Sequence, residues 1–328
     1  MASSYVSPRS TSRVMIFFDH PESFLPQLQA RFPDVAFSAC TSYEKLPVAL
    51  AECAPQVVFG FKFEPKPFPR TDLLCSQGLE WLSVAFAGID GVVPWNEDKL
   101  VVTNASGVAA TEMGHYAIAA ILGCFQGFPA SFANQARHKW QYRVNRSARG
   151  ATLGIVGLGR SGREIARMAR AVGLRVVACR TRAEPSPDVE TVYPTEQLHE
   201  MLRAVDVTVV CAPLTASTQD LFDQPAFAAM KPGAYFINIA RGAIVKEQPL
   251  IDALVSGHLA GAVLDVVRTE PLPSSSPLWD VPNLLITPHS SSEYDGWVEE
   301  AVRMFADNLE RWIAGTPLEN CVRSGRGY

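Results

Sequence analysis

LGIVGLGRSG, at residues 153–162, joins a short apolar run to the start of a pattern with helical spacing. Leu153–Val156 predicts a buried strand, and Ser161–Val172 predicts a helix whose apolar residues share one face. A G-x-G-x-x-G motif between such a strand and helix is typical of dinucleotide-binding folds. The alternative is a tight strand-to-helix turn without a ligand, and the flanking strand and helix favour the binding site over it.

Each glycine of this motif meets a different physical need. Gly157 permits the tight turn, Gly159 lets the backbone approach a pyrophosphate, and Gly162 lets the helix pack close to the strand. The unpaired N–H groups at the start of the helix would then meet the phosphate charge. The motif therefore predicts that a dinucleotide binds at residues 157–162.

The end of the next strand indicates which dinucleotide is bound. Arg180-Thr181-Arg182 follows the predicted strand Arg175–Cys179, at a place where an NAD site usually carries an acid. A carboxylate would repel a 2′-phosphate, whereas a guanidinium binds one with paired hydrogen bonds, to which Thr181 adds a hydroxyl. We therefore expect NADP(H), with NAD(H) as the less favoured cofactor. The alternative is that these arginines only form a solvated loop.

Apolar runs alternate with segments of helical spacing on both sides of this motif, which favours parallel sheets covered by helices. The 328 residues are more than one hydrophobic core usually supports. We therefore predict an α/β fold with two doubly wound parallel-sheet domains. Further strands are expected at Val14–Phe18, Val35–Cys40, Gln56–Phe61, Trp81–Phe86, Val207–Cys211, Tyr235–Ile239, Ala262–Val266 and Leu284–Thr287. Further helices are expected at Tyr43–Cys53, Leu73–Leu79, Thr195–Val205, Glu247–Ser256 and Trp297–Ile313, and a loop at Pro65–Pro69.

Composition excludes several kinds of partner. The formal net charge of −4 argues against nucleic acid or an anionic membrane surface, and no apolar run is long enough to cross a bilayer. The seven cysteines are scattered without a CxxC pair, which favours a reducing, cytoplasmic compartment. The Ser-rich segment Met1–Ser12 is expected to be a plain tail, although import into an organelle stays open as an alternative.

Arg241, Glu270 and His289 follow strand ends or lie in loops of the second α/β series. Ligands of open α/β sheets bind beyond the carboxyl ends of the strands, so these side chains are candidates for one site. Histidine can donate a proton, glutamate favours its charged form, and arginine has a planar fork that matches a carboxylate. Each residue alone has an ordinary structural explanation. Together, after a cofactor loop, they predict hydride transfer to the ketone of a small acid.

Other catalytic chemistries lack support in the sequence. No cluster of residues has metal-ligand spacing and no G-x-S-x-G elbow is present, so neither a metal site nor a serine hydrolase is predicted. The remaining histidines are interpreted as structural or surface residues. They are His20, His115, His138, His199 and His258.

Several stretches, in order across most of the chain, resemble the D-isomer-specific 2-hydroxyacid dehydrogenase family. The resemblance is strongest to its NADP-preferring glyoxylate/hydroxypyruvate reductase type. Besides the glycine motif, the matching stretches are Ala87–Asp90, Thr103–Val108, Met230–Ala234, Asn238–Gly242, Leu264–Val266, Glu270–Pro273 and Thr287–His289.

The resemblance implies the reduction of a 2-oxo acid to the (R)-2-hydroxy acid. His289 would be the acid/base, Glu270 its partner, and Arg241 the group that binds the substrate carboxylate and ketone oxygen. The backbone at Ala87 and Gly88 would also touch the substrate. The implied cofactor contacts are Arg160 and Ser161 at the pyrophosphate, Arg180 to Arg182 at the 2′-phosphate, Cys211, Ala212 and Pro213 at the adenosine, and Met113, Ala240, Arg241, Asp265 and His289 around the nicotinamide.

The resemblance also implies the domain organisation. A flavodoxin-like substrate domain would comprise residues 1–108 and 291–328, and a Rossmann dinucleotide-binding domain would be residues 109–290. Members of the family are typically homodimers. The helix beginning near Glu112 and the segment Phe128–Trp140 would be the dimer elements, with Trp140 reaching the partner's pocket.

Three departures from the family put the shape of the pocket in question. Ser290-Ser291-Ser292 replaces a small apolar residue and glycines, His115 replaces an acid, and Val267 replaces a common aromatic residue. Two alternatives stay open beside the reductase: a dinucleotide-sensing co-regulator that binds protein partners, and an enzyme oxidising formate or phosphite. Glu270 argues against formate, since those enzymes pair their histidine with glutamine, and Arg180 favours a reductive role over phosphite oxidation.

Overall fold

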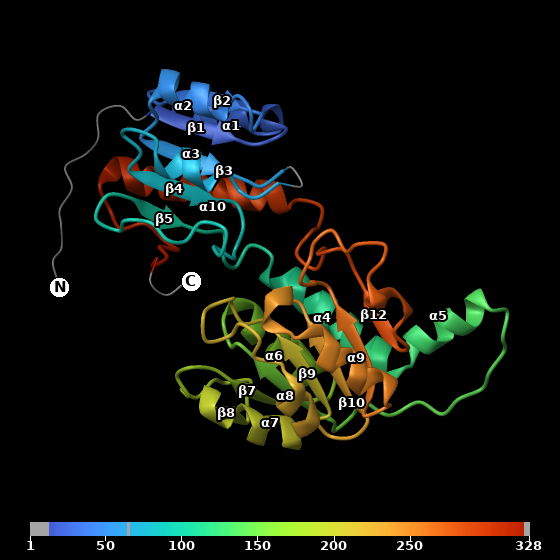
Figure 1. Cartoon of the computed structure of the whole chain (residues 1–328). Coiled ribbons are helices and arrows are strands. Elements are labelled where there is room, and N and C mark those ends of the chain that lie inside the picture. Colours follow the sequence, from blue (N-terminus) through green and yellow to red (C-terminus); the bar gives the residue numbers. More distant parts are fainter. Residues whose placement is uncertain (1–12, 64–65, 325–328) are drawn as a thin grey trace. The chain divides into compact units, whose positions relative to one another are not determined.

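The computed structural model describes residues 13–63 and 66–324. The segment Met1–Ser12, with its two interpretations, lies outside the described residues, as does Pro65 of the predicted loop. The chain divides into two compact units (Figure 1). The first unit contains the residues up to Val108 and those from Asp295 onward, and the second unit is Ala109–Tyr294.

A five-stranded sheet, parallel at every pairing, forms the centre of the first unit. Its order β2-β1-β3-β4-β5 is the flavodoxin-like arrangement. The strands are β1 (Arg13–Phe17), β2 (Ala36–Cys40), β3 (Val57–Gly60), β4 (Trp81–Val84) and β5 (Val101–Thr103). The helices are α1 (Leu25–Arg31), α2 (Leu46–Cys53), α3 (Arg70–Leu74) and α10 (Trp297–Ala314).

Helices cover both faces of this sheet because successive strand residues point to opposite sides. Ile16 and Phe59 belong to the cluster on α1 and α10, whereas Phe17 and Val58 belong to the cluster on α2 and α3. Figure 1 shows α10, in red, beside the strands β3 and β4 of the N-terminal segment. The end of the chain thus returns to complete the first unit.

Aromatic stacking fastens α10 to the sheet. The ring of Phe305 lies 4.4 Å from that of Phe59 and 5.4 Å from that of Trp81, between centroids. Each such pair stabilises a core by about 0.5–1.5 kcal/mol beyond the area it buries. The indole N–H of Trp81 is satisfied by Thr103 Oγ1 at 2.9 Å, so this buried ring leaves no polar group unpaired.

The prediction of a helix at Leu73–Leu79 is wrong in its position. α3 spans Arg70–Leu74 and gives way to turns after Cys75. Gly78 adopts a φ of +82°, the left-handed conformation that interrupts a helix. The apolar spacing of residues 73–79 therefore reflects packing of a short helix and a turn rather than a longer helix.

The second unit is built on a seven-stranded sheet with the order β12-β11-β10-β9-β6-β7-β8, again parallel throughout. Counted from β6, the first six strands follow the Rossmann order 3-2-1-4-5-6, and β12 adds a seventh at the edge. The strands are β6 (Thr152–Val156), β7 (Arg175–Cys179), β8 (Thr191–Tyr193), β9 (Val207–Val210), β10 (Ala234–Asn238), β11 (Leu259–Leu264) and β12 (Leu284–Ile286).

Helices cover both faces of this sheet as well. α4 and α6 pack on one face, through residues such as Ile121 and Ile165, and α7, α8 and α9 pack on the other, through residues such as Met201 and Leu250. The two doubly wound parallel-sheet domains predicted from the sequence are confirmed. The helices are α4 (Ala110–Phe125), α5 (Phe128–Ala136), α6 (Arg160–Ala171), α7 (Leu198–Ala204), α8 (Gln224–Ala229) and α9 (Glu247–Val255).

Among the described residues, no single helix combines the length and the hydropathy of a membrane span. α4 and α5 reach both only when they are taken together, and they are bent by 69° relative to each other. Figure 1 shows α5 and the segment that follows it projecting from the second unit.

Candidate functional site

The glycine loop lies where the strand order of the second sheet reverses, between β6 and β9. Gly157 has a φ of +100°, and its carbonyl accepts a hydrogen bond from Cys211 Sγ at 2.9 Å. A Cβ on Gly162 would lie 2.2 Å from that same carbonyl oxygen, so only glycine allows the helix to approach the strand this closely. Burial raises the pKa of Cys211 to about 12, which keeps the thiol protonated as a donor.

The start of α6 has room for an anion. A Cβ on Gly159 would meet no heavy atom within 4 Å, in contrast to the crowded Gly157 and Gly162. Gly159 is the N-cap of α6, and no described side chain caps the helix there. The N–H groups at a helix start, together with this open space, fit a pyrophosphate.

Three more of the predicted cofactor residues lie beside this loop. Ser161 Oγ lies 3.5 Å from Met113 Sδ, which joins α6 to α4. Ala212, which follows β9, is buried against the glycine turn, and its backbone lies 2.6 Å from where a Cβ on Gly157 would stand. These contacts line the glycine loop on the side where the strand order of the sheet reverses.

Arg180, Thr181 and Arg182 follow the carboxyl end of β7, next to β6. Arg180 is half-buried, and its N–H donates to Tyr193 O of β8 at 3.1 Å. Thr181 and Arg182 are exposed. The position that usually holds the ribose-binding acid therefore presents cations and a hydroxyl to solvent.

Arg241 sits on a turn held by a buried amide. Asn238, at the end of β10, accepts from the Ala240 N–H at 3.0 Å and donates to Arg241 O at 3.1 Å. A Cβ on Gly242 would lie 2.0 Å from Val267 C, so the turn packs directly on the segment that follows β11. The guanidinium donates to Ala240 O at 2.8 Å. These contacts thus fix the backbone position of Arg241.

His289 and Glu270 form a pair beyond the same edge of the sheet. His289 Nδ1 and Glu270 Oε2 lie 2.7 Å apart, and Glu270 Oε1 accepts from the Val267 N–H at 3.1 Å. A carboxylate only accepts hydrogen bonds, so Nδ1 carries the proton and donates. Nε2 is then the ring nitrogen left for other chemistry.

The surroundings of Glu270 favour its ionised form. Burial by itself would raise the pKa of this carboxyl. The hydrogen bond and charge of His289, the Val267 N–H and the charge of Arg241 act in the opposite direction and outweigh burial, so the pKa of Glu270 is lowered.

The backbone of His289 has a φ of +53°, which L residues rarely adopt. Its N–H donates to Asp265 O at 2.8 Å, and the buried Asp265 carboxylate accepts the N–H groups of Ser290 and Ser291 at 2.9 and 3.0 Å. Asp265 thus holds the loop that carries the imidazole.

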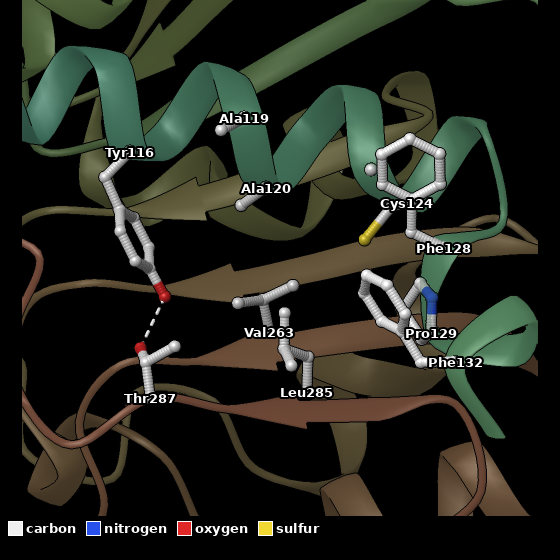
Figure 2. A pocket seen from close by; sticks show the side chains of 11 residues that line it. Tyr116, Ala119, Ala120, Cys124, Phe128, Pro129, Phe132, Val263, Leu285 and Thr287 are labelled. Atoms are coloured by element: carbon white, nitrogen blue, oxygen red, sulfur yellow. Dashed lines mark hydrogen bonds between the residues drawn. The ribbon is translucent and has the colours of Figure 1, made fainter. Parts of the chain in front are cut away.

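Sequence reasoning missed three residues that shape this site. Asn238 belongs to a quoted stretch but received no role, although a buried Asn at a strand end signals a backbone contact. Thr287 precedes His289 by two residues and donates to Asp265 Oδ1 at 2.6 Å. The hydroxyl of Tyr116 lies 2.6 Å from Thr287 Oγ1. Figure 2 draws this hydrogen bond, which no sequence pattern marks.

Not every predicted residue belongs to this cluster. Ala87 and Gly88 lie in the first unit, after β4, where Ala87 O accepts from Asn104 Nδ2 at 2.6 Å. Pro213 follows Ala212 and is exposed. Among the described residues, no group of three or more His, Cys, Asp or Glu side chains is arranged to hold a metal ion.

The comparisons with known proteins agree with this geometry. Residues 118–291 match the model of the D-isomer specific 2-hydroxyacid dehydrogenase, NAD binding domain. The chain is 29% identical to glyoxylate/hydroxypyruvate reductase A of Klebsiella pneumoniae over 79% of this chain and 85% of that protein. It is 35% identical to (S)-sulfolactate dehydrogenase of Chromohalobacter salexigens over 70% of this chain and 75% of that protein.

Solved structures give the same result over nearly the whole length. A D-isomer specific 2-hydroxyacid dehydrogenase of Xanthobacter autotrophicus, in complex with NADPH and MES, superposes with a TM-score of 0.84 at 28% identity. The match covers 97% of this chain and 99% of that one. The glycine loop at the strand reversal, the paired His289 and Glu270, and these matches together show that the chain belongs to the D-isomer specific 2-hydroxyacid dehydrogenase family, oxidoreductases that use a nicotinamide dinucleotide.

Proposed function

We propose that this chain reduces a small 2-oxo acid, of the glyoxylate or hydroxypyruvate kind, to the (R)-2-hydroxy acid with NADPH. The observation that carries the proposal is the 2.7 Å pair of His289 and Glu270. This pair lies at the carboxyl edge of a dinucleotide-binding sheet, and Arg241 follows a strand at the same edge. The similarity to glyoxylate/hydroxypyruvate reductase A supports the substrate class.

The proposed chemistry divides between two transfers. When bound, the reduced nicotinamide supplies a hydride to the carbonyl carbon. His289 Nε2 gives its proton to the carbonyl oxygen, which completes the alcohol, and the neutral imidazole then regains a proton from solvent. Glu270 accepts from Nδ1, which keeps that nitrogen protonated and holds the ring in one orientation, so that Nε2 faces the substrate side of the reaction.

Arg241 is proposed to bind the substrate carboxylate. Its guanidinium can make two parallel hydrogen bonds to a carboxylate, which a lysine cannot. The turn held by Asn238 and packed on Val267 fixes the base of this side chain. The backbone groups of Ala87 and Gly88 remain proposed as further substrate contacts.

The cofactor preference is proposed from residues 180–182. Arg180 and Arg182 offer charge-assisted hydrogen bonds to a 2′-phosphate, and no carboxylate stands at these three positions to repel it. The NADPH in the Xanthobacter autotrophicus structure supports the same preference. Gly157 to Gly162 would hold the pyrophosphate, with Arg160 and Ser161 at the helix start.

One set of assays tests both the activity and the cofactor. Purified protein should oxidise NADPH when glyoxylate or hydroxypyruvate is added, with a clearly lower KM for NADPH than for NADH. Arg180→Asp should raise the KM for NADPH by about tenfold or more, because a charge-assisted hydrogen bond contributes about 1.5–3 kcal/mol. The KM for NADH should change little, and absorbance at the nicotinamide band follows both.

Arg203→Asp provides the matched control, since it makes the same charge reversal on α7. Equal KM values of the wild type for NADPH and NADH would contradict the proposed preference. Absence of turnover across a broad panel of 2-oxo acids with both cofactors would contradict the proposed activity. 3-Sulfopyruvate belongs in that panel because of the similarity to (S)-sulfolactate dehydrogenase.

We also propose that two copies associate through the second unit. An apolar groove runs between α4, α5 and the edge strand β12, with Val263 and Leu285 in its floor (Figure 2). Phe128 and Phe132 of α5 line its end and are more than half exposed, and Trp140 beyond α5 is fully exposed. Large exposed apolar side chains at a groove beside an edge strand favour a protein partner over water.

The mass in solution tests this association. Light scattering after gel filtration should give about twice the chain mass of 35.7 kDa. Phe132→Asp should shift the protein toward the monomer, because it places a charge in the apolar groove. Val48→Asp, at an exposed apolar position of the first unit, serves as the control and should leave the mass unchanged. A monomeric wild type at micromolar concentration would contradict the proposal.

The cysteines support a reducing, cytoplasmic compartment. All seven are free thiols, and Cys124 and Cys179 are buried. Burial raises the pKa of both to about 12, which keeps them protonated and unreactive.

A further inference from the structure

A chain of hydrogen bonds runs from α4 to the loop that carries His289, and Figure 2 shows its first bond, between Tyr116 and Thr287. The hydroxyl of Tyr116 lies 2.6 Å from Thr287 Oγ1, which lies 2.6 Å from Asp265 Oδ1. Thr287 and Asp265 directly follow the neighbouring strands β12 and β11, whereas Tyr116 comes from a helix that covers the sheet. Tyr116, which has no role in the proposed proton transfer, is thus linked by hydrogen bonds to the loop that carries His289.

The donors and acceptors of this chain have one consistent assignment. The Asp265 carboxylate already accepts the N–H groups of Ser290 and Ser291, so it serves as the acceptor for Thr287 too. Thr287 has a single hydroxyl hydrogen, which this bond uses. Tyr116 must therefore donate to Thr287. Burial raises the pKa of Tyr116 to about 12, so the phenol keeps that proton at neutral pH.

Asp265 holds the acid/base loop at two places. Its backbone carbonyl accepts the His289 N–H at 2.8 Å, and its carboxylate binds the next two N–H groups. These bonds maintain the left-handed backbone of His289, with its φ of +53°, which the residue would otherwise leave. The orientation of the Asp265 carboxylate therefore decides where the imidazole stands relative to Glu270.

We propose that Tyr116 is a positioning residue for the reaction: through Thr287 it fixes the Asp265 carboxylate and thereby the loop of His289. The inference rests on the proposed function and adds to it a residue that does not touch substrate or cofactor. Linked hydrogen bonds strengthen one another in a low-dielectric interior, so loss of the first bond loosens the second.

Tyr116→Phe removes only the hydroxyl and should lower kcat about fivefold, the effect of one typical hydrogen bond, while the KM values for substrate and cofactor stay near wild type. Thr287→Val removes both bonds and should lower kcat by about tenfold or more, whereas Thr287→Ser, which restores the hydroxyl, should recover most of the loss. The double variant Tyr116→Phe with Thr287→Val should match Thr287→Val alone, because both changes break one chain.

A readout without turnover completes the test. Hydrogen exchange at the amides of Ser290 and Ser291 should accelerate in Tyr116→Phe, because both amides are bound by Asp265. Tyr235→Phe is the control, since it removes a phenol hydroxyl from the opposite, amino end of β10 and should leave exchange and kcat unchanged.

The outcomes separate this inference from the proposed function. If the wild type shows no turnover but exchange at the Ser290 and Ser291 amides still accelerates in Tyr116→Phe, the link between Tyr116 and the loop is supported and the proposed reaction is contradicted. An active wild type with unchanged kcat and exchange in Tyr116→Phe would overturn the inference alone. Additive effects of Tyr116→Phe and Thr287→Val would overturn it too, as would a kcat loss that appears only because the protein changes its oligomeric state.

Discussion

Replacing His289 with glutamine is expected to lower kcat by a factor of about 100 to 10,000, the usual contribution of a positioned acid/base. Glutamine keeps a similar length and can still donate to Glu270 Oε2, so the loop need not rearrange around an unpaired carboxylate. It carries no proton that it can give to a carbonyl oxygen. Steady-state assays with NADPH and glyoxylate measure kcat, and quenching of nicotinamide fluorescence measures the Kd for NADPH, which should stay near that of the wild type.

His199→Gln is the matched control, because His199 is exposed on α7 and its change should leave kcat unaltered. Full turnover in His289→Gln would remove the imidazole from the mechanism. Loss of NADPH binding equal to the loss of kcat would assign His289 to cofactor binding rather than proton transfer.

The sequence predicted the two sheets well because their strands carry a strong local signal. β6, β7, β9 and β10 are continuous apolar runs, and burial on both faces of a parallel sheet requires that composition. The glycine loop was predictable for a different reason. A φ of +100° at Gly157 and the 2.2 Å approach at Gly162 exclude other residues. The geometry of the loop therefore requires glycine at these positions, and the sequence shows it.

Other elements leave weaker traces. β5 and β8 have only three residues each and lie at sheet edges, where one side is open and the apolar signal is short. The position of α3 depends on a left-handed Gly78 and on contacts with the sheet, neither of which apolar spacing reports. In each case tertiary packing outweighs the local pattern.

Within the candidate site, strand-end positions identified Arg241, Glu270 and His289, since each follows a strand of one sheet. The pairing of Tyr116 with Thr287 joins residues 171 positions apart through a helix and a strand end. Taken singly, Tyr116 and Thr287 are each only a half-buried polar side chain. Only the packing of α4 against the β12 end reveals the contact, so no motif could have predicted it.

Arg241→Ala is expected to lower kcat/KM for glyoxylate about 100-fold or more. Removing one partner of a hydrogen-bonded charge pair in a site of this kind costs about 2–5 kcal/mol, and each 1.4 kcal/mol is a factor of ten. The proposed role makes a sharper prediction than loss of activity alone. Methyl glyoxylate lacks the anionic carboxylate, so the wild type should prefer glyoxylate over its methyl ester, and Arg241→Ala should lose that preference.

The comparison of acid and ester separates substrate binding from a structural effect. Arg241 also donates to Ala240 O, so its removal can disturb the turn held by Asn238. A disturbed turn would lower kcat/KM for both compounds equally, whereas a lost carboxylate contact lowers it only for the acid. Arg241→Lys keeps the charge but not the planar fork, and its kcat/KM for glyoxylate should fall between those of the wild type and Arg241→Ala. Equal losses for glyoxylate and its methyl ester in Arg241→Ala would show that Arg241 shapes the turn and does not bind the acid.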